Sequence, residues 1–192
     1  MRAAPVLKSS RVWLKLAEVG DAQALLDYYI QNKDHLAPTD PPKPPGFYTV
    51  DFWSQRLKSS FEEFGLGKSA RFVLIKPAVE HSIFGTVNFT NIVRGPFQAC
   101  YLGYSIAAAQ EGKGLMSEAL KLGIEYAFDQ LGLHRIMANH LPQNLRSEKL
   151  LKRCGFVVEG YAKEYLMIDG RWQDHVLNSL TNPRWETKAL LP

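Results

Sequence analysis

The sequence contains few cysteines, no long apolar run and no strong excess of one charge. Its two cysteines, Cys100 and Cys154, do not form a CxxC pair, and its five histidines show no metal-ligand spacing. We therefore expect both cysteines to be small buried hydrophobic side chains, and we expect no metal site. No stretch approaches the roughly 18 apolar residues of a membrane span. A formal charge of +4 is well short of the clustered charge of a dedicated DNA-binding protein.

The beginning of the chain, MRAAPVLKSS, also lacks the apolar segment of a signal peptide, so we expect a cytoplasmic protein. With 192 residues, of which 46% are hydrophobic, the chain is expected to form one domain over residues 1–192. A pI near 9.0 suits an anionic cofactor or contact with an RNA-rich surface such as the ribosome.

Residues 107–129 combine a glycine-rich loop, QEGKG at 110–114, with a strongly patterned helix. The first amides of a helix have no intrahelical partner and carry the positive end of its dipole, so a phosphate can bind there. Gly112 and Gly114 remove obstructing Cβ atoms, and Lys113 adds a mobile charge. A turn that needs glycine only for a positive φ is an equally good explanation, since neither GxxxxGK(S/T) nor GxGxxG occurs. The apolar face of the helix comprises Met116, Ala119, Leu120, Gly123, Ile124, Ala127, Phe128 and Leu131.

The rest of the pattern predicts further strands and helices around this segment. Strands are expected at residues 12–16, 71–76, 83–93, 99–106, 134–140, 156–168 and 171–180, and helices at 21–30, 51–64 and 144–154. Short turns make the three strands from 71 to 106 antiparallel, whereas the intervening helix makes strands 99–106 and 134–140 parallel. Asp169-Gly170 favours a type I′ hairpin turn. The proline-rich segment PTDPPKPP at 38–45 is expected to be an extended surface loop, either a linker or a loop over a substrate site.

The segments LGYSI, QEGKGLMSEAL, HRIMANHLPQNLRSEKLLKRCGF, EGYAKEYLMIDG and RWQDHVLNSL resemble the GNAT acyl-CoA-dependent N-acetyltransferases. They are most similar to the RimJ/RimL branch, which acetylates the amino-terminal alanine of ribosomal proteins. The resemblance implies an α+β GNAT acyltransferase fold, with a mixed, mostly antiparallel central sheet splayed between its fourth and fifth strands and helices on both faces. One difference is Ala109, which stands where the superfamily usually has Gln or Arg.

The resemblance also implies that acetyl-CoA is the cosubstrate. Its pyrophosphate would bind the amides of residues 110–114, and its pantetheine arm would pair with the free edge of the family's fourth strand. Asn144 would bind the pantetheine or fix the loop, although a helix N-cap explains the same residue. The candidate cofactor-binding residues are Tyr104, Ser105, Ile106, Gln110, Glu111, Gly112, Lys113, Gly114, Asn144 and Ser147.

The implied mechanism is direct attack of a neutral amine on the thioester in a ternary complex. An amide near Tyr104 or Ser105 would stabilise the oxyanion, and the Ser147 hydroxyl would protonate the departing thiolate. Tyr165 and Tyr161 are alternative proton donors. Glu164 is the first candidate for a base acting through water and Glu159 the second, although each is also explained as a surface strand residue.

The resemblance therefore predicts transfer of acetyl to the α-amine of a protein, in particular an Ala-starting protein of the small ribosomal subunit. Two alternatives remain. One is a ribosome-assembly factor with a minor catalytic role, which the pI and the proline-rich loop support only weakly. The other is acetylation of small-molecule amines, although the loops contain no dense acidic cluster to bind a cationic substrate.

Overall fold

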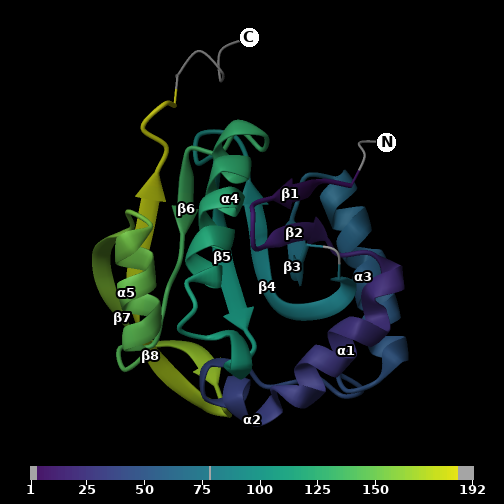
Figure 1. Cartoon of the computed structure of the whole chain (residues 1–192). Helices are drawn as coiled ribbons and strands as arrows, with labels where there is room; N and C mark the ends of the chain where they lie inside the picture. Colours follow the sequence, from purple (N-terminus) through teal and green to yellow (C-terminus); the bar gives the residue numbers. More distant parts are fainter. Residues whose placement is uncertain (1–3, 78, 186–192) are drawn as a thin grey trace.

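The computed structural model describes residues 4–77 and 79–185. Both ends of the expected domain, residues 1 and 192, lie outside this range. The described residues contain one eight-stranded sheet with the order β1-β2-β3-β4-β5-β6-β8-β7 (Figure 1). The strands are Val6–Lys8 (β1), Trp13–Leu16 (β2), Ala70–Lys76 (β3), Val79–Val93 (β4), Ala99–Ile106 (β5), Arg135–Met137 (β6), Val157–Ile168 (β7) and Arg171–Thr181 (β8).

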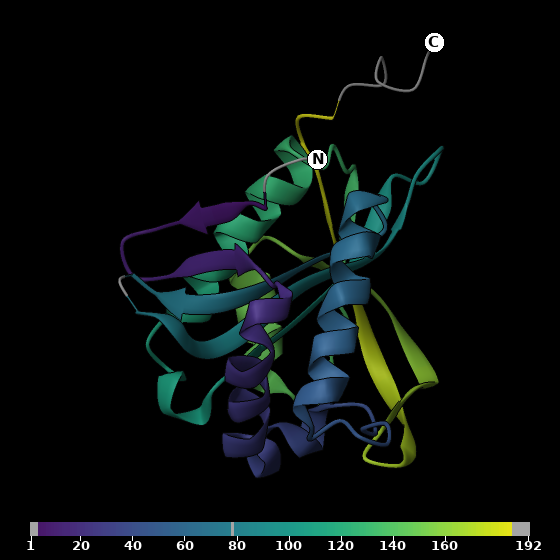
Figure 2. The same cartoon turned by 90° about the vertical axis from the view of Figure 1, so that its right-hand side faces the viewer.

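Helices cover both faces of this sheet (Figures 1 and 2). Successive side chains of a strand point to opposite faces, and β3 shows the division clearly. Phe72 and Leu74 pack in one core with α4 and α5, whereas Val73 and Ile75 pack in a second core with α1 and α3. The helices are Ala22–Gln31 (α1), Lys33–Leu36 (α2), Val50–Gly65 (α3), Leu115–Asp129 (α4) and Leu145–Arg153 (α5), with 3-10 turns at Val19–Asp21, Ala37–Thr39 and Ala108–Gln110.

The sheet splits next to β5. Neighbouring strands are antiparallel except for β5 and β6, which pair in parallel only from Ala99↔Arg135 to Tyr101↔Met137. On its other edge β5 stays paired with β4 as far as Ile106. Residues 102–106 of β5 therefore have β4 on one edge and no partner strand on the other. This architecture confirms the α+β fold with a splayed, mostly antiparallel sheet.

The sequence pattern missed or misplaced a few elements. β1 and α2 were not predicted, because three or four residues are too few to establish a period. The strand expected at 134–140 is reduced to Arg135–Met137, since the chain leaves β5 at this point. Part of the expected extended loop at 38–45 lies in the 3-10 turn Ala37–Thr39. The hairpin turn is as expected, with positive φ at both Asp169 and Gly170.

Candidate active site

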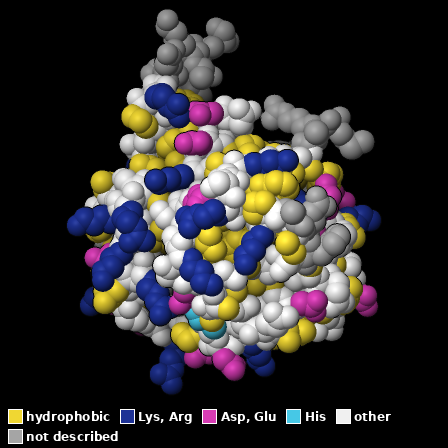
Figure 3. Space-filling view, in the orientation of Figure 1, with side chains coloured by type: hydrophobic (Ala, Val, Ile, Leu, Met, Phe, Trp, Pro, Cys, Tyr) yellow, Lys and Arg dark blue, Asp and Glu magenta, His cyan; other side chains and the backbone are white. Residues whose placement is uncertain are grey.

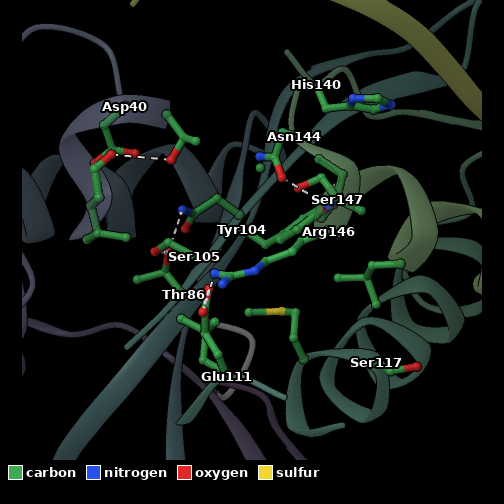
Figure 4. Close-up of a pocket in the computed structure, with 18 of the residues that line it drawn as sticks. Asp40, Thr86, Tyr104, Ser105, Glu111, Ser117, His140, Asn144, Arg146 and Ser147 are labelled. Atoms are coloured by element: carbon green, nitrogen blue, oxygen red, sulfur yellow. Dashed lines mark hydrogen bonds and ion pairs between the residues drawn. The ribbon is translucent and has the colours of Figure 1, made fainter. Parts of the chain in front are cut away.

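A cavity of about 1270 Å³ opens where β5 and β6 separate (Figure 4). Its walls come from the end of β5, the first turns of α4 and α5, the segment after α2 and the β7–β8 hairpin. The cavity reaches both faces of the sheet. Tyr104 packs with the core beneath α4 and α5, whereas Ser105 points to the other face, where Tyr28 of α1 donates a hydrogen bond to it at 2.8 Å.

The loop before α4 leaves several amides free. Gly112 and Gly114 have φ of +71° and +76°, and an ideal Cβ at Gly112 would meet no atom within 4 Å. The amides of Gln110 and Glu111 are used in the 3-10 turn, donating to Ala107 and Ala108. Among the described residues, no hydrogen bond is found for the amides of 112–114. The available amides are therefore those of 112–114 and the first turn of α4, rather than all of 110–114.

The Lys113 ammonium folds back onto its own loop. It donates to the Ala109 carbonyl at 2.5 Å and to the Gln110 side-chain oxygen at 3.2 Å. It therefore orders the loop in this conformation, and it must release these contacts before it can reach a ligand phosphate.

Arg11, which sequence analysis did not single out, lies at the same helix start. Its Nη1 donates to the Lys113 carbonyl at 3.1 Å, and its Nη2 is 2.6 Å from Oε2 of Glu118. The Ser9 hydroxyl also donates to Glu118, and this bond, followed by those from Arg11, lowers the pKa of the carboxyl group. Because about a hundred residues separate these partners, no local pattern indicates the contact.

The side chain of Glu111 links two elements across the cavity. One of its oxygens pairs with Arg146 of α5, and the other is 3.5 Å from Nε2 of His35 in α2 (Figure 4). His35 Nε2 also lies 3.2 Å from the Ile106 carbonyl, at the free end of β5. The amide of Glu111 is thus used in the turn and its carboxylate in ion pairing, so the amides that follow it are the ones left free for a ligand.

Tyr104 and Ser147 come together at the split. Burial raises the pKa of Tyr104 to about 12, while the nearby Ser147 hydroxyl partly opposes this shift. The Tyr104 hydroxyl is buried and makes no hydrogen bond of normal geometry within the described structure. Asn144 caps α5 as expected, because its Oδ1 accepts a bond from the Ser147 amide at 3.1 Å. The cap fixes the first turn of α5, which places Ser147 in the cavity wall.

Ser105 attaches β5 to the neighbouring elements. Its Oγ receives the bond from Tyr28 and lies 2.9 Å from the Thr86 hydroxyl. These two contacts occupy the side chain and attach β5 to α1 and β4. The main-chain groups of Ser105 face β4, because Ser105 pairs with Thr86 and the Ala107 amide, two residues on, donates to the Phe84 carbonyl. Hydrogen-bonded pairs alternate along an antiparallel ladder, so the free edge presents the main-chain groups of Tyr104 and Ile106 instead.

The structure does not bring Glu164 to the cavity. The register of β7 against β8 shifts between Ala162 and Leu166, and Glu164 lies in this bulge with φ of +46°. Its amide donates to Asp174 at 2.8 Å, while Leu166 lines the cavity. The bulge breaks the alternation from which Glu164 was expected to share the face of Leu166.

The other hairpin candidates also lie outside the cavity wall. Glu159 pairs with Arg135, whose hydrogen bond is the main cause that lowers the pKa of Glu159. The Tyr161 hydroxyl donates to Asp174 at 2.7 Å, and the Tyr165 hydroxyl accepts from Asn139 at 3.0 Å.

The proline-rich loop overhangs the far end of the cavity. Thr39, Asp40 and Pro41 line it, and the Lys43 ammonium holds the loop in place by contacting Asp40 at 2.5 Å and the ring of Phe47 at 4.7 Å. This arrangement matches the expected loop over a substrate site. Further wall residues that the sequence did not indicate are Tyr29, His35, Thr86, His140 and His175.

Comparison with known proteins identifies the family to which this architecture belongs. The profile of the acetyltransferase (GNAT) domain matches residues 11–157. The chain belongs to the GNAT acetyltransferase family. It is 46% identical to the ribosomal protein uS5-alanine N-acetyltransferase of Escherichia coli K12 over 179 residues, which are 93% of this chain and 92% of the relative.

Two solved GNAT structures support this assignment. The ribosomal-protein-S5-alanine acetyltransferase of Vibrio fischeri has a TM-score of 0.90 and 38% identity, covering 95% of this chain and 99% of that one. Mycobacterium smegmatis RimJ, solved in complex with CoA-disulfide, has a TM-score of 0.83 and 26% identity, covering 98% and 89%. The predicted resemblance to the RimJ/RimL branch is confirmed, and the protein is an N-acetyltransferase.

Two further findings on the structure concern metal sites and membrane-spanning helices. Residues 4–77 and 79–185 contain no group of three or more His, Cys, Asp or Glu side chains placed to hold a metal ion. In the same ranges, no helix combines the length and the apolar character that crossing a membrane requires.

Proposed function

We propose that this protein transfers the acetyl group of acetyl-CoA to the α-amine of the N-terminal alanine of ribosomal protein uS5, by direct attack in a ternary complex. The observation that carries the proposal is the 46% identity, over nearly the whole chain, to an E. coli enzyme named for this substrate. The proposal includes a cytoplasmic location, contact with the ribosome or its precursors, and a single domain over residues 1–192.

The residues at the cavity fit acetyl-CoA. The open space at Gly112 and the free amides of 112–114 suit a pyrophosphate, and the unpaired edge of β5 suits the amide groups of pantetheine. Lys and Arg side chains gather on the side of the molecule that carries α5 (Figure 3). Four of them, Lys121, Arg146, Lys149 and Arg153, line the cavity and can balance phosphate charge.

Tyr104 and Ser147 would serve the departing thiolate. When bound, acetyl-CoA supplies an activated acyl group, and its thiol must regain a proton. The Tyr104 hydroxyl is protonated at neutral pH, burial raises its pKa further, and the Ser147 hydroxyl lies beside it. The two hydroxyls act as a pair, one donating to the sulfur and regaining its proton from the other, so both are needed.

An α-amine needs little help from a general base on the enzyme, because it loses its proton easily. At a pH of roughly 7.4, deprotonating an α-amine with a pKa near 7.8 costs about 0.5 kcal/mol, whereas a lysine near 10.4 costs about 4 kcal/mol. The reaction therefore does not require Glu164 in the cavity. The same difference favours N-terminal amines over lysine side chains as acceptors.

The two alternatives expected from the sequence are not favoured. The spermidine N(1)-acetyltransferase of Vibrio cholerae matches only 36% of this chain, whereas the uS5-alanine relative matches 93%. A role in ribosome assembly alone does not account for a cavity whose walls fit acetyl-CoA.

A panel of acceptors tests the proposal. The protein is incubated with acetyl-CoA and one of three acceptors, and release of free thiol is followed. The acceptors are the N-terminal peptide of uS5, the same peptide with a blocked α-amine, and spermidine. We expect turnover only with the free uS5 peptide. Turnover with spermidine alone, or no turnover despite CoA binding, contradicts the proposal.

A further inference from the structure

A second cavity, of about 150 Å³, lies between α3 and the sheet. It borders the large cavity, because Tyr29, Thr86 and Asn88 line both. One wall is aromatic. The rings of Tyr29 and Trp53 are stacked with centroids 4.8 Å apart, and Phe47 packs against both.

Three polar atoms in the walls of this cavity are buried without a partner. They are Nε1 of Trp53, Oγ of Ser60 and Nε of Arg71, and none makes a hydrogen bond with any described residue. Trp53 is only 7% exposed to solvent, and Ser60 only 5%. Buried polar atoms normally have partners, so three orphans around one cavity indicate a group that binds there. The two nitrogen atoms can only donate, so that group must offer hydrogen-bond acceptors, as a carboxylate does.

The charges around the cavity favour an anion. Arg56 and Arg71 both line it, and the carboxylate nearest to them is Glu63, at 3.7 Å and 3.6 Å. Glu63 also accepts a bond from the Ser69 hydroxyl at 2.8 Å, so its charge is shared among several donors. Two guanidinium groups thus share one carboxylate as their ion-pair partner.

The small cavity lies within reach of the first few residues of an acceptor peptide whose amine is at the split. Arg71 of β3, Asn88 of β4 and Gly103 of β5 are paired in one row across the sheet. Two strand spacings, about 10 Å in all, therefore separate Arg71 from the free edge of β5. An extended peptide advances by roughly 3.3 Å per residue, so a side chain on its second to fourth residue reaches this distance.

We propose that this small cavity is a subsite for a carboxylate side chain on the second to fourth residue of the acceptor protein. Trp53, Ser60 and Arg71 donate hydrogen bonds to its oxygens, and Arg56 and Arg71 balance its charge. The inference rests on the proposed function, since it concerns the acceptor whose α-amine is acetylated.

The test compares Ala-starting peptides that carry Glu or Gln at position two, three or four and are otherwise identical. Wild type is expected to show a kcat/KM about tenfold higher for Glu than for Gln at one of these positions, mainly through KM. Ser60→Ala and Trp53→Phe each remove a donor and should reduce this ratio toward one. Ser59→Ala, on the exposed side of the same helix, should leave it unchanged. Because the ratio is taken within each variant, a general loss of activity does not alter it.

Equal rates for Glu and Gln peptides in wild type would overturn the subsite and leave the proposed function standing. A preference for Glu that survives in both Ser60→Ala and Trp53→Phe would also overturn it. If no Ala-starting peptide is acetylated at all, the proposed function fails, and the subsite fails with it.

Discussion

At the residue scale, the proposed chemistry depends on two hydroxyl groups, those of Tyr104 and Ser147. We expect Tyr104→Phe and Ser147→Ala each to lower kcat by about 10²-fold, the usual effect of losing a general acid. The Kd for acetyl-CoA should change little, because neither hydroxyl lies at the amides of 112–114. Steady-state kinetics and calorimetric titration with acetyl-CoA provide the two measurements.

Tyr161→Phe is the matched control for Tyr104→Phe, since its hydroxyl bonds Asp174 outside the cavity wall. Because the pKa of Tyr104 is about 12, its ionisation should not affect the rate below a pH of roughly 10. Wild-type kcat in both Tyr104→Phe and Ser147→Ala would exclude the pair as the proton donor.

For Glu164, in contrast to Tyr104 and Ser147, we predict that substitution leaves activity nearly unchanged. Because it lies in the β7 bulge and outside the cavity wall, Glu164→Gln should retain nearly full kcat/KM at every pH. The measurement is the pH profile of kcat/KM with the uS5 peptide. Loss of an ionisation on the acidic side of that profile would show that Glu164 reaches the acceptor after all.

Single residues were predictable from the sequence where their role is local. Asn144 caps the helix that follows it, and a cap depends only on the next three residues. Glu164 was misplaced because a bulge cannot be seen in an alternating pattern. Arg11 and His35 were missed because they reach the site from distant segments, and only the folded sheet brings them together.

At the scale of elements, we propose that the start of α4 binds the phosphates of the cofactor through its backbone amides. Gly112→Val should raise the Kd for CoA by more than tenfold, because the new side chain fills the open space above the free amides. It also forces a branched residue into a left-handed conformation, which costs about 1–2 kcal/mol.

Gly67→Val is the matched control for this strain. Gly67 has φ of +67° and open space around it, but it lies just beyond α3 and away from the cavity wall. Both variants should lose similar thermal stability, and only Gly112→Val should lose CoA binding. Equal CoA affinity in the two variants would show that the phosphates bind elsewhere.

The cap of α5 has a comparable test. Asn144→Ala and Thr49→Ala each remove a side-chain N-cap, at α5 and α3 respectively, and each should cost about 1 kcal/mol of unfolding free energy. Only Asn144→Ala should also lower kcat, because its cap positions Ser147. Chemical denaturation and kinetics measure the two effects. Unchanged kcat in Asn144→Ala would separate the cap from catalysis.

Most elements were predictable because their apolar period is long enough to recognise, as in α3, α4, β3 and β5. The split in the sheet was not derivable from periodicity. It came from the family resemblance, since the length of the β5–β6 pairing depends on contacts between segments about 35 residues apart.

At the scale of the whole molecule, the split makes one cavity accessible from two faces. The free amides and basic side chains lie on the side of α4 and α5, and the proline-rich loop lies at the other end, beside α1 and α2. Cofactor and acceptor can therefore enter from opposite directions and meet beside Tyr104 and Ser147. This arrangement supports the proposed direct transfer in a ternary complex.

The most direct test is to locate the acetyl group by mass spectrometry after incubating the protein and acetyl-CoA with full-length, unacetylated uS5. We predict a single acetyl group on the α-amine of the N-terminal alanine and none on lysine side chains. Acetylation confined to lysines, or an unmodified N-terminus in the presence of bound CoA, would contradict the account.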